Sequence, residues 1–566
     1  MHLRKTLLSA AIVTSLFGLA ACSDDDDKDT SPSTRATIEL SVLGSYRTNL
    51  FDEGAAEIVA HDPVHQRLFV INAAASTVDV LDIQDPAMPS KLATIDASAE
   101  GASANSVAVH GDLVAVAIEA EDKQAAGQVV FYNATDLNKV GAVTVGALPD
   151  MVTFTPDGQR VLVANEGEPS DDYSNDPRGS VSIIDLTNGV AAAAVTTAGF
   201  EAFDGQEAEL RAQGIRIFGP GASASQDFEP EYIAVAPDGD SAWVTLQENN
   251  AVAEIDLTEN RISRVLPLGY KDHSVAGNEL DPSNRDLNAD PSNEDGAIRL
   301  ASWPVLGMYQ PDAIAAYAVA GQTYYVTANE GDARDYDGFS EELRIKDLTL
   351  ADGAFADLAG LQEDHQLGRL KTTWTQGISN DCDPYGAGAG NYKDAAEADC
   401  EFDTLYAYGA RSFSIWSASG ELVFDSGSAF ETITAEQLPA FFNATNDDNN
   451  FDNRSDDKGP EPEGVTVGQI NGQTFAFIGL ERVGGIMVYD ISTPQAPTFV
   501  QYLNNRDFNV SEADLQAGMA GDLGPEGLAF ISAADSPTGA PLLAVGNEVS
   551  GSTTLYAIAV SEVADE

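Results

Sequence analysis

Residues 459–481 have the sequence GPEPEGVTVGQINGQTFAFIGLE, in which two short apolar segments flank an Asn-Gly pair and acids stand near both ends. Apolar runs bounded by turn residues are typical of β-strands, and an Asn-Gly pair between them is typical of a hairpin. Four other stretches follow the same plan: 148–168, 229–249, 310–331 and 524–548. The chain therefore repeats a β-hairpin that carries carboxylates at two fixed points.

Weaker copies raise the number of repeats to seven, and most copies add a third strand that ends in Asp-Leu or Asp-Ile. Repeats of short strands predict a β-propeller. The last repeat has three clear strands, so we expect residues 36–45 to supply a fourth strand and close the ring. We predict an all-β, seven-bladed β-propeller with acidic loop insertions, forming a single domain over residues 36–562 with an insertion at about 338–404. Residues 340–430 either complete the fifth blade or form an eighth blade.

The N-terminal segment is expected to lie outside the propeller. Residues 1–21 join a basic start to an apolar stretch too short to span a bilayer, which is typical of a signal peptide. The motif LAAC predicts cleavage before Cys22 and lipidation of its thiol, so the mature protein would be held at the membrane by lipid. Ser23 favours the outer membrane of a Gram-negative cell envelope, and residues 22–35 are predicted to be an acidic flexible tether.

The charge balance narrows the range of partners. The formal net charge is −61, from 90 acidic and 29 basic residues. Such a surface repels the phosphates of nucleic acid, so we exclude nucleic-acid binding. We expect a monomer, most of whose acids form a solvated surface.

Two cysteines remain beyond the lipidation motif. Cys382 and Cys400 flank a glycine-rich stretch. An exported protein is in an oxidising compartment, so we predict a disulfide between them. A metal site at two free thiols is the alternative, with no CxxC motif or neighbouring histidine to support it.

The repeated acids are predicted to form a ring. In a propeller, the start of each first strand and the end of each second strand lie at the same mouth of the central channel. One set, the first-strand acids, is Glu57, Asp150, Glu231, Asp312, Glu463 and Glu526. The other set, the second-strand acids, is Glu119, Glu166, Glu248, Glu330, Glu481 and Glu548.

A ring of bare carboxylates is unfavourable, because two like charges about 4 Å apart repel by about 4 kcal/mol at an effective dielectric of about 20. Protons, arginines or cations must offset this repulsion. Calcium fits best, since it takes six to eight oxygen ligands in flexible geometry. Zinc and copper fit poorly in a chain with six histidines. The alternative for any one acid is turn chemistry, in which the carboxylate accepts backbone N–H groups.

Basic residues are scarce, so those embedded in the acidic loops stand out. An arginine beside metal-bound carboxylates is suited to holding an anion such as phosphate. The alternative is that each base neutralises its acidic neighbours. The residues in question are Arg334, Arg344, Arg411, Arg454, Lys458 and Arg482.

Several motifs resemble those of the choice-of-anchor I proteins, which include mesenchyme-specific cell surface glycoproteins and bacterial members often labelled alkaline phosphatase. They include VANEGEPSDDYS, TANEGDARDYDGFSEE, SDDKGPEPEGVTVG and GLERVGGIMVYDI, and the resemblance covers about residues 40–560. The resemblance implies a β-propeller held at a surface. It leaves the molecular activity open.

Two functions remain open. The first is a surface module whose calcium-bound mouth binds a glycan, a protein or another ligand. The second is a calcium-dependent phosphoesterase in which Glu463 and its neighbours hold the metal while Arg334 and Arg482 bind the phosphate ester. The sequence contains no G-x-S-x-G or P-loop motif, and a calcium-filled propeller mouth serves both functions.

Overall fold

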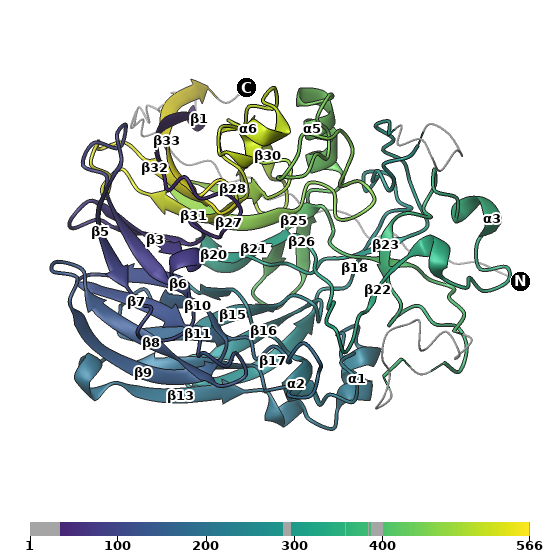
Figure 1. Ribbon diagram of the computed structural model, residues 1–566, viewed down its shortest axis with the longest axis horizontal. Helices are drawn as coiled ribbons and strands as arrows, with labels where there is room; N and C mark the ends of the chain where they lie inside the picture. Colours follow the sequence, from purple (N-terminus) through teal and green to yellow (C-terminus); the bar gives the residue numbers. More distant parts are fainter. Residues whose placement is uncertain (1–33, 287–295, 357, 383, 386–399, 565–566) are drawn as a thin grey trace, which may run out of the picture. The chain divides into compact units, whose positions relative to one another are not determined.

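The computed structural model describes residues 34–286, 296–356, 358–382, 384–385 and 400–564. The larger of its two units, Ala36–Ser561, contains the fold. Its described residues form seven four-stranded sheets and two smaller ones (Figure 1). The predicted signal peptide, Cys22 and most of the tether lie outside the described residues.

The first four sheets follow one another along the chain, and their strands are antiparallel neighbours in sequence order. They consist of β2 (Val59–Asp62), β3 (Arg67–Asn72), β4 (Thr77–Asp82) and β5 (Ser90–Asp96); β6 (Ala104–His110), β7 (Leu113–Ile118), β8 (Ala126–Asn133) and β9 (Lys139–Ala147); β10 (Pro149–Phe154), β11 (Arg160–Asn165), β12 (Ser180–Asp185) and β13 (Ala194–Gly199); and β14 (Ile233–Val235), β15 (Ser241–Leu246), β16 (Ala251–Asp256) and β17 (Arg261–Pro267).

The other three four-stranded sheets complete the series. They consist of β20 (Ile314–Val319), β21 (Gln322–Asn329), β25 (Ser412–Ser417) and β26 (Leu422–Asp425); β27 (Pro462–Ile470), β28 (Gln473–Leu480), β29 (Ile486–Asp490) and β30 (Thr498–Leu503); and β31 (Pro525–Ile531), β32 (Leu542–Asn547), β33 (Ser552–Ala564) and β1 (Thr34–Arg47).

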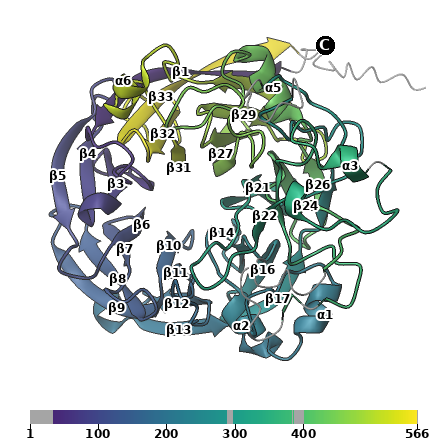
Figure 2. The ribbon, with the colours of Figure 1, turned by 45° about the vertical axis from the view of Figure 1, so that its right-hand side comes forward.

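The seven sheets stand around a central channel. The first strand of each sheet contacts the first strand of the next sheet, and β31 contacts β2 to complete the circuit. Figure 2 shows these inner strands around an opening, with the colours running once around the ring. The all-β propeller expectation is confirmed by this arrangement.

The last sheet joins the two ends of the unit. Its strand order is β31-β32-β33-β1, so the N-terminal strand lies beside the C-terminal one. The sequence predicted this closure from residues 36–45, and the strand observed is somewhat longer. Closure holds the N-terminal and C-terminal strands of the unit together within one sheet.

The middle strands are buried on both faces because each sheet packs between two others. In β28, seven of eight residues are buried. One apolar cluster joins Leu162 and Ile183 of one sheet to Val244 and Ile255 of the next. Strands buried on both faces read as continuous apolar runs, which is the pattern of the repeat.

Two inserted segments form small sheets outside the ring. β18 (Tyr270–Asp272), β19 (Leu306–Met308) and β24 (Tyr406–Ala407) form a three-stranded sheet, and β22 (Glu342–Arg344) pairs with β23 (Lys371–Thr373). The described part of residues 340–430 therefore completes the fifth four-stranded sheet and supplies strands to the two small sheets, and it does not form an eighth four-stranded sheet. SFSIWSA and ELVFDSG become β25 and β26, while LGRLKTTWT and TLYAYGA supply β23 and β24.

Helices are short and lie in the connections. They are α1 (Glu207–Ala212), α2 (Ala224–Asp227), α3 (Leu358–Leu361), α5 (Ala429–Gln437) and α6 (Glu512–Gln516), with 3₁₀ turns at Ala73–Ala75, Val190–Ala192, Glu201–Phe203 and Ile345–Asp347. Within the described ranges, no helix has the length and apolar character needed to cross a membrane.

Candidate functional site

Three of the six first-strand acids lie in β-bulges. In β10, Asp150 lies between the cross-strand pairs Pro149–Asn165 and Val152–Val163, so this strand holds one residue more than its partner. A bulge bends the strand and redirects a side chain. The same offset occurs in β27 and β31, at Glu463 and Glu526. The repeated proline–acid pattern therefore encodes a bulge at the start of the inner strand.

The second-strand acid is fixed beside the first-strand acid of its own repeat. Its backbone amide donates to the carbonyl of the residue that precedes the proline. The three clearest cases are Glu166 N to Leu148 O (2.9 Å), Glu481 N to Glu461 O (2.8 Å) and Glu548 N to Gly524 O (2.8 Å). The repeat thus brings both of its acids to one mouth of the channel.

Glycines allow neighbouring inner strands to approach closely. A Cβ added to Gly464 would lie 1.9 Å from the carbonyl oxygen of Glu526, and one added to Gly527 would lie 2.5 Å from the carbonyl oxygen of Glu57. Only glycine fits such a backbone contact. The Pro-Glu-Gly sequence therefore sets successive acids of adjacent sheets side by side.

A cavity of about 270 Å³ lies where these bulges meet. It is lined by residues at the start of all seven inner strands. Its carboxylates are Glu57, Asp150, Asp312 and Glu526, and Asn105 stands at the position where the second repeat lacks an acid. Four of the six first-strand acids thus share one cavity.

Burial, followed by repulsion between neighbouring carboxylates, raises the pKa of these acids. The pKa of Glu57 rises to about 8, with Glu548 and Asp150 as its charged neighbours. The pKa of Asp150 rises to about 7, and that of Glu248 to about 7. The pKa lies well above its usual value for Glu166, Glu231, Asp312, Glu463, Glu481 and Glu526, and it is also raised for Glu330 and Glu548.

Several of the ring carboxylates have a buried oxygen without a hydrogen-bond donor. These oxygens are Oε2 of Glu231, Glu248, Glu463 and Glu526. A buried acceptor that lacks a donor costs about 1–3 kcal/mol, and more when it is charged. Carboxylate oxygens that accept no hydrogen bond can coordinate a metal ion, and calcium prefers oxygen ligands. The residues at the mouth therefore suit calcium.

Three mouth acids are instead neutralised by the protein itself. Ligand atoms of Glu330, Glu461 and Glu481 lie within 4.8 Å of one another. Lys458 Nζ lies 3.2 Å from Glu461, and Arg482 Nε lies 3.2 Å from Glu461 and 3.0 Å from Glu481. Although burial acts to raise it, the pKa of Glu461 is lowered by these cations.

Sequence reasoning missed Glu461. It stands two positions before Glu463 in the GPEPEG motif, and the prediction used only the second acid of that pair. The cluster of bases that surrounds it, Arg454, Lys458 and Arg482, was the signal that this acid is buried and paired.

The six singled-out bases all pair with carboxylates. Arg334 is buried and bonds Asp227 (2.7 Å) and Glu229 (2.9 Å), so its guanidinium donors face internal partners. Arg482 keeps 28% of its side chain exposed. The remaining pairs are Arg344–Asp456, Arg411–Glu431, Arg454–Asp457 and Lys458–Glu330. Each of these six bases therefore neutralises acids that lie beside it.

The predicted disulfide is present, between Cys382 and Cys400. Cys400 is buried in an apolar cluster of the inserted region, with Trp374 and Phe402. The bond staples this region, and it lies apart from the residues that line the mouth cavity.

The sequence is similar to two curated animal proteins. It is 32% identical to Gigasin-3a of Magallana gigas over 164 residues, which is 27% of this chain and 57% of that protein. It is 24% identical to the mesenchyme-specific cell surface glycoprotein of Strongylocentrotus purpuratus over 303 residues, which is 47% of this chain and 35% of that protein. The chain thus spans less than two thirds of the length of either relative.

Solved structures with similar chains include Kuenenia stuttgartiensis hydrazine synthase and the Swd1 β-propeller domain of Myceliophteria thermophila. The first has a TM-score of 0.42 at 12% identity and covers 91% of this chain and 97% of that one. The second has a TM-score of 0.39 at 10% identity and covers 92% of this chain and 99% of that one.

The model of the choice-of-anchor I domain matches residues 57–494. This range begins at the first ring acid, Glu57, and includes five of the seven four-stranded sheets in full, with three of the four strands of a sixth. The match covers more than half of the chain and agrees with the motifs at the channel mouth. The protein therefore belongs to the choice-of-anchor I family.

Proposed function

We propose that this protein is a cell-surface binding module whose carboxylate-rich channel mouth holds calcium and, through it, an oxygen-rich ligand. The single observation that carries the proposal is the set of buried carboxylate oxygens without donors at Glu231, Glu248, Glu463 and Glu526. Of these four acids, Glu526 lines the mouth cavity. A protein that gathers such buried carboxylates at one channel mouth requires protons or a cation to offset their repulsion.

The ring supplies ligands from several sheets. Glu57, Asp150, Asp312 and Glu526 face the cavity, and Asn105 adds a neutral amide oxygen. Calcium bound there would supply a positive centre with open positions for carboxylate, hydroxyl or phosphate oxygens of a ligand. The protein's own part is to hold these carboxylates at the starts of the inner strands, two of them in bulges.

The surface location rests on the family and on the N-terminus. Choice-of-anchor I proteins are named for their anchoring, and one relative is named a cell surface glycoprotein. We propose that lipid on Cys22 holds this chain at the cell envelope, on the outer membrane of a Gram-negative bacterium. The glycan, phosphate-ester or protein ligand then reaches the mouth from outside the membrane.

The proposal does not include phosphoester hydrolysis. That alternative assigns the phosphate to Arg334 and Arg482, and the donors of Arg334 face Asp227 and Glu229. Two arginines beside the mouth acids are partly exposed, Arg482 at 28% and Arg454 at 21%, and both are paired with carboxylates.

Calcium titration calorimetry of the full-length protein in detergent tests the proposal, with a Glu463→Gln, Glu526→Gln double variant. We expect saturable calcium binding to be weakened at least tenfold in the double variant, because two of the unpartnered carboxylates lose their charge. A Glu209→Gln, Glu436→Gln double variant is the control, because it makes the same change in net charge at two exposed residues that do not line the cavity. An unchanged calcium affinity in the Glu463→Gln, Glu526→Gln double variant would show that the channel mouth is not a calcium site. Calcium-dependent hydrolysis of p-nitrophenyl phosphate would favour the phosphoesterase instead.

A further inference from the structure

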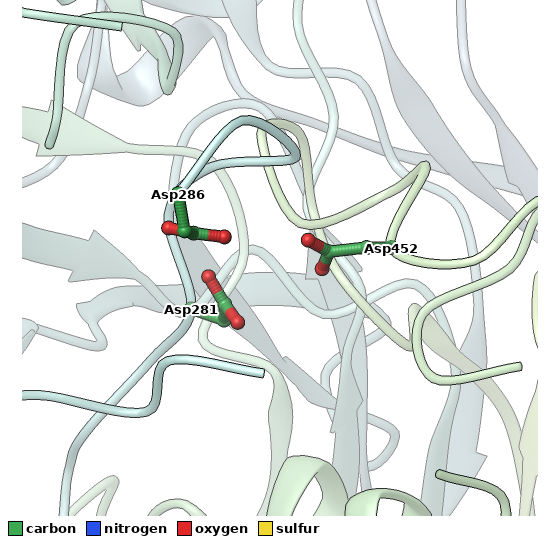
Figure 3. Close-up of side chains that lie close together, drawn as sticks. All are labelled: Asp281, Asp286 and Asp452. Atoms are coloured by element: carbon green, nitrogen blue, oxygen red, sulfur yellow. The ribbon is translucent and has the colours of Figure 1, made fainter. Parts of the chain in front are cut away.

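A second group of three carboxylates lies outside the channel mouth. Asp281 and Asp286 belong to the loop between β18 and β19, and Asp452 belongs to the segment between α5 and β27. One oxygen of each lies within 4.8 Å of the others. Figure 3 shows the three carboxyl groups facing one another. Two segments far apart in the sequence therefore meet through like charges.

Backbone and hydroxyl donors satisfy only part of this group. Arg299 N donates to Asp281 Oδ2 at 2.6 Å, Ala297 N donates to Asp286 Oδ2 at 3.3 Å, and Ser455 Oγ donates to Asp452 Oδ1. Two buried oxygens, Asp286 Oδ1 and Asp452 Oδ2, have no donor. Asp452 is completely buried, at 0% exposure, and its carboxyl is aimed at the other two.

The mouth group of Glu330, Glu461 and Glu481 provides an internal comparison. Its ligand atoms lie equally close together, and Lys458, Arg454 and Arg482 neutralise it. Across the described part of the chain, no basic side chain forms an ion pair with Asp281, Asp286 or Asp452. Among the described residues, cations therefore pair with the carboxylates of the mouth group, and those of the second group form no ion pair.

The nearby arginines turn their guanidinium groups to other partners. Arg411 Nη1 donates to the backbone oxygen of Asp281 and to Glu431 Oε1, both at 2.7 Å. Arg299 Nη1 donates to the carbonyl of His365 at 2.6 Å. These contacts hold the backbone of the site in place without an ion pair to its carboxylates, although the charge of Arg299 acts to lower the pKa of Asp286.

The pKa values agree with the absence of a paired cation, since burial outweighs the lowering effect of Arg299 on Asp286. Burial raises the pKa of Asp452 to about 10, with Asp281 as the strongest charged neighbour. Burial likewise raises the pKa of Asp281 to about 8 and that of Asp286 to about 6. The group is therefore stable either with bound protons or with a bound cation.

We propose that Asp281, Asp286 and Asp452 bind one divalent cation of the calcium class, separate from the channel mouth, which fastens the β18–β19 loop to the segment before β27. Carboxylate oxygens are the ligands such ions prefer, and water completes their coordination. The amide oxygen of Asn443, buried and without a donor, is a further neutral candidate on the same segment as Asp452. The ion would act as a staple between two loops.

Terbium, a luminescent substitute for calcium, tests this site in the full-length protein. Trp303 Nε1 donates to the carbonyl of Leu280 at 3.2 Å, so an indole lies beside the residue that precedes Asp281. We expect tryptophan excitation to produce saturable terbium emission that calcium displaces. Asp286→Asn and Asp452→Asn should each weaken the terbium affinity at least tenfold.

The Glu463→Gln, Glu526→Gln double variant is the matched control, because it changes mouth acids and leaves this group intact. Its terbium emission through tryptophan should persist even if the mouth binds no calcium, so the two proposals fail separately. Emission that is absent in the parent protein, or unchanged in both aspartate variants, would overturn the site. If the Asp452→Asn variant does not fold, the terbium affinity of the Asp286→Asn variant decides the outcome, because Asp286 is only half-buried.

Melting temperatures give a second readout. With chelator, Asp286→Asn should melt at the same or a higher temperature than the parent, because it removes repulsion. With calcium, the parent should gain more in melting temperature than the variant, because ligand binding stabilises the folded state. An equal calcium response in both proteins would mean that a proton, and not a cation, is shared by these carboxyls.

Discussion

Lys458 Nζ lies 2.6 Å from Glu330 Oε1 and donates equally closely, at 2.6 Å, to the carbonyl of Gly331. This contact joins the segment before β27 to the residue that follows β21. It links two adjacent sheets at the channel mouth with a charge that belongs to the protein. The mouth therefore contains both a neutralised sector and a sector of bare carboxylates.

Lys458→Met should destabilise the protein by about 3–5 kcal/mol, because it leaves buried carboxylates without their cation. Urea unfolding at neutral pH measures the free energy. Lys139→Met is the control, since Lys139 and Glu100 have side chains 41% and 22% exposed, and such pairs contribute at most about 1 kcal/mol. Equal losses in the two variants would show that Lys458 is not a buried counter-ion.

Stability without calcium should fall as the pH rises from about 4.5 to about 8. The pKa of Glu57 rises from the model-compound value 4.5 to about 8 on folding. The folded state therefore binds more protons than the unfolded state in this window, so raising the pH favours unfolding. Melting temperature in chelator, measured across the window, checks the sign.

Calcium should reverse this trend. It binds deprotonated carboxylates, so it should raise the melting temperature more at pH 8 than at pH 5. A calcium effect that is the same at both pH values would contradict a role for the high-pKa mouth acids. Loss of stability towards low pH in chelator would contradict the direction of the shifts.

Gly464→Ala should cost about 1–3 kcal/mol or more, because the new Cβ meets the backbone carbonyl of Glu526. It should also reduce calcium affinity, since separating β27 from β31 moves two first-strand acids. Gly472→Ala is the control: its left-handed backbone (φ 81°) is unfavourable for alanine, yet nothing lies within 4 Å. Calorimetry that finds normal calcium affinity in Gly464→Ala would argue against coupling between sheet spacing and the site.

Replacing both Cys382 and Cys400 by serine should cost about 3 kcal/mol, as expected for closing a loop of this size. The two cysteines are 18 residues apart. Because the bond lies in the inserted region, hydrogen exchange should accelerate near Trp374 and Phe402, and exchange in the ring strands should change little. Uniform acceleration throughout the ring would mean that the insertion is part of its cooperative unit.

The sequence was sufficient for the ring because its signal is local and repeated. The proline–acid pair, the turn and the second-strand acid recur in one order. The structure places Glu463 and Glu481 at one mouth, as this order requires in a hairpin. Even the closing strand was predictable, since the last repeat lacked a partner that residues 36–45 supply.

The charge pairing was not predictable, because it depends on contacts between distant segments. The sequence left Arg334 either an anion or neighbouring acids as its partner, and its actual partners, Asp227 and Glu229, come from the connection before β14. Asp452 meets Asp281 only after the inserted loop folds against the segment before β27. No spacing rule relates positions so far apart.

Because β1 lies between β33 and solvent at the rim, the first strand to be synthesised must wait for the last. A chain that lacks its final strands would be an open arc, and the first strands would have no neighbour to complete the circle. Such long-range pairing folds slowly and late. The mouth acids would then come together only at the end of folding, so a nascent chain would have no assembled mouth with which to capture an ion during synthesis.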